Sequence, residues 1–141
     1  MHVSRICTKE TIAVGPDDLI SRVAHQMREN HVGAVVVQED GRPVGIVTDR
    51  DITLRCGGRR DILADIPVRE IMSKNVVTAA PNEDVLDVLA RMRENGVRRI
   101  PVVNEAGLLA GMVTLDDILL HVARSMRHVA EVVMAELQHE G

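Results

Sequence analysis

The stretch Gly45-Ile46-Val47-Thr48-Asp49-Arg50-Asp51-Ile52 returns 66 residues later as Gly111-Met112-Val113-Thr114-Leu115-Asp116-Asp117-Ile118. Each copy predicts a short apolar strand that runs into a helix, with a threonine at the junction and an aspartate three residues later. The threonine hydroxyl can cap the helix, and the helix dipole favours the aspartate. The same groups, together with free backbone N–H groups, also suit a nucleotide, whose phosphate and ribose they would bind. Because the arrangement occurs twice, we favour this second interpretation.

The repetition extends well beyond this motif. An offset of 65 residues aligns residues 3–30 with residues 68–95 without a gap. We expect one extra residue near Val97 or Arg98, after which the offset becomes 66. The chain is therefore interpreted as a tandem duplication. Its parts are repeat 1 over residues 1–56, a linker over 57–67, repeat 2 over 68–125 and a C-terminal helical extension over 126–141.

Within each repeat the hydrophobic periodicity predicts the same order of elements, β-α-β-β-α. Short apolar runs that flank a glycine-containing turn are typical of a buried β-hairpin. Neither repeat can cover its sheet alone, so we expect an α/β (α+β) fold in which the two sheets pack together with helices outside. The expected strands are 12–14, 34–37, 44–47, 76–78, 100–103 and 109–113, and the expected first helices of the repeats are 18–30 and 83–95.

Those first helices are amphipathic, because apolar residues recur on one face at helical spacing. The predicted buried faces are Ile20, Val23, Ala24 and Met27 in repeat 1, and Val85, Val88, Leu89 and Met92 in repeat 2.

The last helix outruns its counterpart in repeat 1, and its apolar residues follow a nearly heptad spacing. A small two-repeat core cannot bury such a stripe completely. The helix could fold back on its own domain, but we favour packing against a second copy, which predicts a homodimer. The stripe consists of Leu115, Leu119, Val122, Met126, Val129, Val133 and Leu137.

Composition excludes several classes of protein. The chain has 141 residues, of which 45% are apolar and 27% charged, as in an ordinary globular domain. It has no Phe, Tyr or Trp, so the core must be aliphatic and no aromatic platform can stack the bases of single-stranded nucleic acid. The net charge of −4 also disfavours a DNA partner held through its phosphates.

Membrane, secretory and catalytic signals are also missing from the sequence. No uncharged run is long enough to span a bilayer, and no signal peptide is expected. Cys7 and Cys56 form no CxxC pair, which favours the reducing cytoplasm over a disulfide framework. No GxSxG, HExxH or P-loop motif occurs, and His121 and His128 lack further ligands at a metal-binding spacing. We therefore expect neither catalytic residues nor a metal site.

The paired motif Gly-hydrophobic-x-Thr-x-x-Asp, within a β-α-β-β-α repeat, resembles the CBS (cystathionine β-synthase) domain. Two such domains in tandem form a Bateman module, and the resemblance covers residues 3–125. It implies two sheets around a pseudo-twofold axis, two clefts for adenosine-containing ligands, and a flat dimer. The implied ligands are AMP, ADP, ATP or S-adenosylmethionine. A small stand-alone module of this kind would sense its ligand and change its shape or its contacts with a regulated protein, without performing chemistry.

The resemblance also implies which residues form the clefts. In one cleft Thr48 would reach phosphate and Asp51 would bind the ribose, and in the other Thr114 and Asp117 would do the same. The opposite repeat would supply the remaining walls: Ala80, Val85, Val97 and Arg98 for the first cleft, and Gly15, Ile20 and Val32 for the second.

Family members often carry basic residues just before the second strand, where they bind phosphate. Arg98 and Arg99 match this place, because a guanidinium suits phosphate geometry. Repeat 1 has Val32 and Gly33 there, so we expect the Asp117 cleft to be the better nucleotide site, and we interpret His31 as a helix-end residue. The main alternative is a protein-interaction module with degenerate clefts. The intact threonine and aspartate in both copies argue against it.

Overall fold

The structure, a computed structural model, describes residues 1–56 and 66–140. The linker expected over 57–67 lies mostly outside the described residues. The elements of the first half are η1 (Val3–Arg5), β1 (Ala13–Val14), α1 (Ile20–Asn30), β2 (Ala34–Glu39), β3 (Arg42–Thr48) and α2 (Asp49–Cys56). Those of the second half are η2 (Val68–Glu70), α4 (Val85–Asn95), β4 (Arg99–Val103), β5 (Leu109–Thr114) and α5 (Leu115–Glu140).

The expected α+β fold with two similar halves is confirmed, with sheet order β1-β2-β3 in one half and β4-β5 in the other. The strand predicted at 76–78 is wrong. Only Ala79 reaches β4, where its N–H donates to the Pro101 carbonyl oxygen (3.0 Å) and its own carbonyl oxygen accepts from Val103 N (2.9 Å). This isolated parallel bridge replaces the counterpart of β1.

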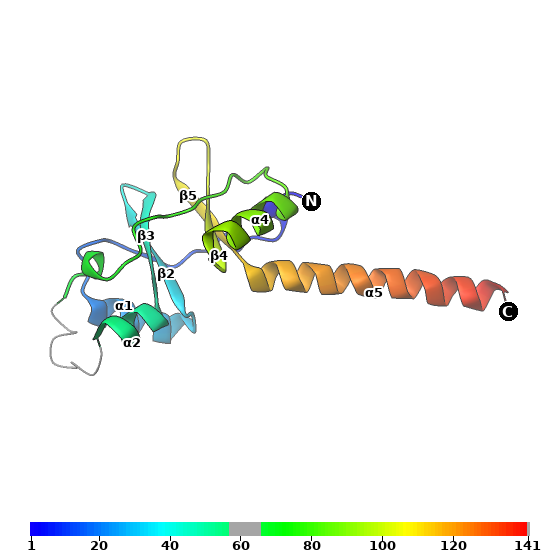
Figure 1. The fold of residues 1–141 in the computed structure, drawn as a ribbon, viewed down its shortest axis with the longest axis horizontal. Coiled ribbons are helices and arrows are strands. Elements are labelled where there is room, and N and C mark those ends of the chain that lie inside the picture. The colour runs from blue at the N-terminus through cyan, green and yellow to red at the C-terminus, as the bar shows by residue number, and fades with distance from the viewer. Residues whose placement is uncertain (57–65, 141) are drawn as a thin grey trace.

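The leading segment of each repeat packs on the other repeat. Val3 N–H donates to the Glu83 carbonyl oxygen of repeat 2 (3.0 Å), and Val68 N–H donates to the Asp18 carbonyl oxygen of repeat 1 (2.8 Å). Figure 1 accordingly shows the N-terminus beside α4. The two repeats are therefore tied together by a reciprocal exchange of their first residues.

The exchange continues along the sheets. Thr8 bridges Met112 on β5, and Ser73 bridges Ile46 on β3. The approach at β5 is close enough to require a glycine, because a Cβ atom at Gly111 would lie 2.7 Å from the Thr8 carbonyl oxygen. Each sheet is thus extended by a segment from the opposite repeat.

The two hairpins fix how the repeats correspond. Val37 lies opposite Gly45 and Val102 opposite Gly111, so the offset between the repeats is still 65 along β2 and β4. The extra residue of repeat 2 therefore lies in its hairpin turn, within 104–108, rather than after α4 as the sequence alignment predicts. Apolar runs as short as these align almost as well when one is shifted by a residue, and the shifted alignment even gains one identity, whereas cross-strand pairing fixes the register.

Two aliphatic clusters form the core, one in each half. The expected helix faces are buried except for Ala24, which is exposed, and Leu89, which is half-buried. The first cluster is Val14, Ile20, Val23, Met27, Val35, Val37, Val47, Val68 and Ile71. The second cluster is Val3, Ala79, Val85, Val88, Met92, Ile100, Val102, Val113 and Ile118. Val3 and Val68 lie in the core of the opposite repeat, so the exchange of leading segments is part of both cores.

Helix α5 leaves the body of the molecule and projects away from it (Figure 1). Ile118 is its one buried residue, and every residue from Val122 to Glu140 is exposed. The alternative in which this helix folds back on its own domain is therefore not what the structure shows. Among residues 1–56 and 66–140, no helix has both the length and the apolar character needed to cross a membrane.

Candidate functional site

The repeated motif forms the same capping arrangement in both halves. Thr48 N–H donates to Asp51 Oδ2 (2.9 Å), and Asp51 N–H donates to Thr48 Oγ1 (3.1 Å). Thr114 and Asp117 make the same two contacts at the same distances. This is a reciprocal capping box at the start of α2 and α5. Each carboxylate uses one oxygen in the cap, and each threonine accepts through its oxygen, so a hydroxyl proton remains for a ligand.

A cleft of about 250 Å³ lies between the motif of repeat 1 and the opposite repeat. We call it the Asp51 cleft. Hydroxyl, amide, carboxylate and guanidinium groups line it together with valine side chains. The lining residues are Ile46, Thr48, Asp51, Ser73, Asn75, Val76, Val77, Gly96, Val97, Arg98 and Arg99.

A second cleft, of about 210 Å³, lies at the related position near Thr114, and we call it the Thr114 cleft. It is lined by Thr8, Glu10, Thr11, Ile12, Val32, Gly33, Ala34, Arg99, Met112 and Thr114. Most of its residues correspond to residues of the Asp51 cleft at an offset of 65 or 66, including Thr8 with Ser73 and Val32 with Val97. The two clefts are therefore related by the internal duplication.

The clefts differ in charge. Glu10 takes the place of Asn75, and Gly33 takes the place of Arg98, while Arg99 lines both clefts. Each cleft thus has one carboxylate, from Asp51 or Glu10, but the Asp51 cleft has two guanidinium groups and the Thr114 cleft has one. The family resemblance implied that Arg98 lines the cleft of Thr48 and Asp51, and the structure places it there. The further expectation that the two arginines favour the cleft with Asp117 does not agree with the structure, because both line the Asp51 cleft and only Arg99 also lines the Thr114 cleft.

Several residues implied by the family resemblance do not line the clefts. Val85 (6% exposed) and Ile20 (1% exposed) are the first residues of α4 and α1, and both point into the cores. Ala80 and Gly15 lie in the turns before those helices, where their N–H groups donate to Glu83 and Asp18 side chains. Asp117 caps α5 without lining the Thr114 cleft. His31 occupies the C-cap of α1 with φ 53°, as a helix-end residue.

The sequence did not reveal the cleft-lining residues that follow the leading segment of each repeat, which is the segment that packs on the opposite repeat. All residues of 73–77 except Lys74 line the Asp51 cleft, and all residues of 8–12 except Lys9 line the Thr114 cleft. No motif marks them, because they contribute through their position after the leading segment of each repeat. Thr11 Oγ1 is buried and has no hydrogen-bond partner among the described residues. A buried hydroxyl without a partner is costly, and this one belongs to a residue that lines the Thr114 cleft, although its oxygen is not exposed to the cleft.

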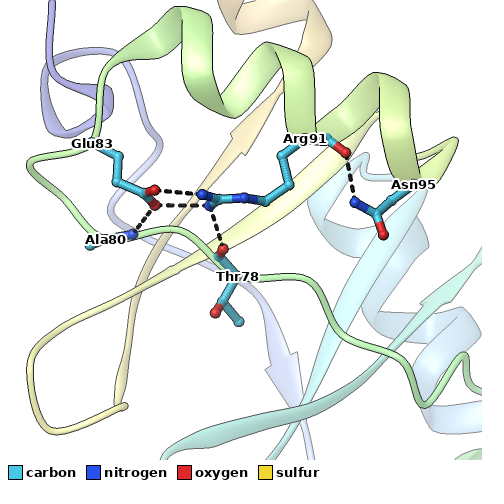
Figure 2. Close-up of polar contacts among 5 residues, drawn as sticks. All are labelled: Thr78, Ala80, Glu83, Arg91 and Asn95. Carbon is cyan, nitrogen blue, oxygen red and sulfur yellow. Dashed lines mark hydrogen bonds and ion pairs between the residues drawn. The ribbon is translucent and has the colours of Figure 1, made fainter.

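An ion pair braces the segment that follows the wall of the Asp51 cleft. The Arg91 guanidinium on α4 donates two hydrogen bonds to the Glu83 carboxylate, as Figure 2 shows. Their lengths are 2.9 and 2.5 Å. Arg91 also donates to the Thr78 carbonyl oxygen (2.8 Å), and Glu83 accepts from Ala80 N (2.8 Å). The hydrogen bonds from Arg91 lower the pKa of the Glu83 carboxyl. The bracing is specific to repeat 2, because Gln26 stands where repeat 1 would have the arginine.

We expect Arg91→Met to lower the free energy of unfolding at pH 7 by about 1.5–3 kcal/mol, the range for hydrogen bonds to charged groups. Since the pKa of Glu83 is lowered in the folded state, its contribution is present above the usual carboxyl pKa and is lost as the pH falls through the lowered pKa. Thermal unfolding at pH 7 and at acidic pH should therefore show a smaller difference between wild type and variant in acid.

The matched control for this experiment is Gln26→Met in repeat 1. Among the described residues, the side chain of Gln26 has one hydrogen bond, an exposed one that it accepts from Asn30 (3.2 Å). The free energy of unfolding should therefore change by no more than about 0.5 kcal/mol. Equal destabilisation by both variants would contradict the bracing role of the Arg91–Glu83 pair.

The comparison with known protein families agrees with this architecture. The family model described as CBS domain matches residues 3–57 and 68–124. The chain therefore belongs to the CBS-domain family and contains two CBS domains in tandem.

Individual relatives are similar over most of this chain. The CBS domain-containing protein YhcV of Bacillus subtilis is 36% identical over 115 residues, which is 81% of this chain and 80% of YhcV. The uncharacterized protein MK0525 of Methanopyrus kandleri is 33% identical over 120 residues, and the match covers 84% of this chain but only 61% of that protein.

Among solved structures, the CBS domain pair of protein MJ0100 superimposes with a TM-score of 0.79 at 25% identity. The match covers 89% of this chain and 98% of that one. That structure is described as a complex with 5′-methylthioadenosine and S-adenosyl-L-methionine.

Proposed function

We propose that this protein is a non-catalytic regulatory module that binds an adenine nucleotide of the AMP, ADP or ATP type in the Asp51 cleft. The observation that carries the proposal is the meeting, in one cleft, of a capping threonine and aspartate from repeat 1 with Arg98 and Arg99 from repeat 2. The adenosine ligands of the MJ0100 domain pair support the same ligand class.

Each group in the cleft has a role in this proposal. Asp51 accepts hydrogen bonds from the ribose hydroxyls through the oxygen that the cap leaves free. Thr48 and Arg98 bind phosphate, since a guanidinium and a hydroxyl both donate to its oxygens. The adenine ring lies against Val76, Val77 and Val97, because aliphatic walls must replace aromatic stacking in a chain without aromatic residues. The cleft volume is just below the range of about 300–1,000 Å³ typical of ligand sites.

The Thr114 cleft suits a different ligand. Glu10 repels phosphate, and Gly33 contributes no side-chain donor in the place of Arg98. We therefore propose that this cleft binds phosphate less well and prefers an adenosine compound without phosphate, such as S-adenosylmethionine.

We also propose that the protein is a homodimer and that its signal leaves through α5. Leu115 N–H, at the start of α5, donates to the Arg98 carbonyl oxygen (2.8 Å). The Arg98 guanidinium lies 3.7 Å from Asp116 in the first turn of the same helix. A phosphate bound at Arg98 would compete with Asp116 for the guanidinium in this weak, exposed pair. Ligand binding in the cleft would therefore change a contact in the first turn of α5.

Calorimetric titration of the purified protein with AMP, ADP, ATP, adenosine and S-adenosylmethionine tests the proposal. We expect AMP to bind at one site per chain and at least about tenfold more tightly than adenosine, since charge-assisted hydrogen bonds are the stronger ones. Absence of heat with every ligand, together with an unchanged melting temperature, would contradict nucleotide sensing.

The exposed stripe of α5 favours a second candidate function, a protein-interaction module with little or no nucleotide binding. The titration separates the two, because an interaction module does not require the clefts to be occupied.

A further inference from the structure

Helix α5 carries most of the exposed large apolar side chains among the described residues. Its 26 residues extend for about 39 Å at 1.5 Å per residue. Monomeric proteins rarely expose a continuous apolar surface of this length. The large apolar residues at least half exposed on the helix are Leu119, Leu120, Val122, Met126, Val129, Val132, Val133, Met134 and Leu137.

The residues beside the stripe allow a close approach. Ala123, Ser125 and Ala130 flank its middle, whereas Arg124 and the Arg127–Glu131 ion pair (3.9 Å) lie on other faces of the helix. Coiled coils usually carry charged residues at these flanking positions. Small residues there let two helix backbones come near each other, as at other tightly packed helix crossings.

We propose that α5 pairs in an antiparallel arrangement with α5 of a second copy, with the twofold axis at Ala123 and Ser125. This inference rests on the homodimer proposed above and specifies its geometry. In this register every layer of the seam is apolar on both sides. The layers pair Leu115 with the partner's Val133, Leu119 with the partner's Val129, and Val122 with the partner's Met126, each occurring twice by symmetry.

A parallel pair would be less favourable. The heptad positions that continue the seam are occupied by Glu136 and Glu140. In a parallel pair each of them would meet its own copy, and like charges at facing positions are destabilising. In the antiparallel register, these glutamates pass beyond the start of the other α5 instead, where they reach the surface of α4.

The surface they reach is an apolar groove, with a volume of about 460 Å³, between α4 and the start of α5. It is continuous with the stripe through Leu115, and Leu86 at its edge is 70% exposed. Arg93 provides the charge complementary to the partner's Glu136, while the partner's Leu137 covers the apolar part. The groove is lined by Leu86, Leu89, Ala90, Met92, Arg93, Gly96, Val97 and Leu115.

Single cysteines placed on α5 test the register in the full chain. In a background with Cys7→Ser and Cys56→Ser, we expect Ala123→Cys to form a disulfide-linked dimer on mild oxidation, because the two copies of residue 123 meet at the axis. Glu136→Cys should remain monomeric on a non-reducing gel, since its two copies would be about 36 Å apart along the helices. Circular dichroism checks that each variant is folded.

Light scattering of the same samples under reducing conditions measures whether each variant is a monomer or a dimer. It therefore tests the proposed homodimer separately from the antiparallel register of α5. A dimer that cross-links at residue 136 and not at residue 123 would overturn the antiparallel register and leave the homodimer standing. A monomer, or a dimer linked at neither position, would overturn pairing through α5. Both results are independent of the titration that tests nucleotide binding.

Discussion

Removal of residues 125–141 should convert the dimer into a monomer while leaving nucleotide affinity unchanged. The truncation deletes Met126, Val129, Val133 and Leu137 from the stripe of α5 but keeps the buried Ile118. Burial of a single such side chain is worth about 1.5–3 kcal/mol. Because about 1.4 kcal/mol corresponds to a tenfold change, the dissociation constant of the dimer should rise by more than about 100-fold. Sedimentation velocity over a range of concentrations measures this change.

Nucleotide affinity serves as the internal control, because the residues that line the two clefts end at Thr114. A matched pair of substitutions in the full chain separates the stripe from the helix as a whole. Val129→Asp, on the stripe, should reproduce the monomer, whereas His128→Asp, exposed on a neighbouring face, should leave the dimer intact. A truncated protein that remains a dimer would show that another surface holds the two copies together.

The capping boxes show how much of the site was accessible from sequence. Thr48 and Asp51 are three residues apart at a strand-to-helix junction, and this spacing predicted that the threonine hydroxyl caps the helix and that the helix dipole favours the aspartate. The same prediction was made for Thr114 and Asp117, and both threonine caps are present at the same distance. The hydrogen bond from each threonine N–H to its aspartate was not predicted. Local chemistry of this kind is readable because all the atoms involved lie within one turn of chain.

The exchanged leading segments show where sequence reasoning ended. Val3 and Val68 are equivalent positions in the two repeats, and each is apolar enough for either core. Internal symmetry does not reveal which repeat a segment joins, since packing on its own repeat and exchange give the same periodicity. The cleft walls at 8–12 and 73–77 follow from this exchange, so they could not be assigned from spacing.

The position of Arg98 depended on a similar long-range relation. Its match to a phosphate-binding position was visible in the sequence, but the cleft it faces is set by how the repeats cross. The structure places it in the cleft with Thr48 and Asp51, as the family resemblance implied, and not in the Thr114 cleft that the basic residues alone were expected to favour. This placement changes the expected preference of the two clefts for phosphate.

The Asp51 cleft and the proposed dimer groove share a wall. Gly96 and Val97, in the turn that ends α4, line both the Asp51 cleft and the groove. A ligand in the cleft and a partner helix in the groove would therefore bear on the same short segment. Any resulting effect must be reciprocal, because a ligand that strengthens the dimer is bound more tightly by the dimer to the same extent.

Asp51→Asn should weaken AMP binding by about 10- to 100-fold, as measured by calorimetry. A hydrogen bond to a charged group contributes about 1.5–3 kcal/mol, and the amide removes the charge that the ribose hydroxyls would contact. The substitution keeps an oxygen that can accept from Thr48 N–H, so the cap of α2 is largely retained.

The matched control is Asp117→Asn, because Asp117 makes the same capping contacts without lining either cleft. Both variants should lose a similar and small amount of stability, of the order of 0.5–2 kcal/mol for a weakened cap. Only Asp51→Asn should lose affinity for AMP. If the two substitutions weaken AMP binding equally, the ribose contact does not belong to Asp51, and AMP binding instead depends on both capping boxes or on the Thr114 side of the module.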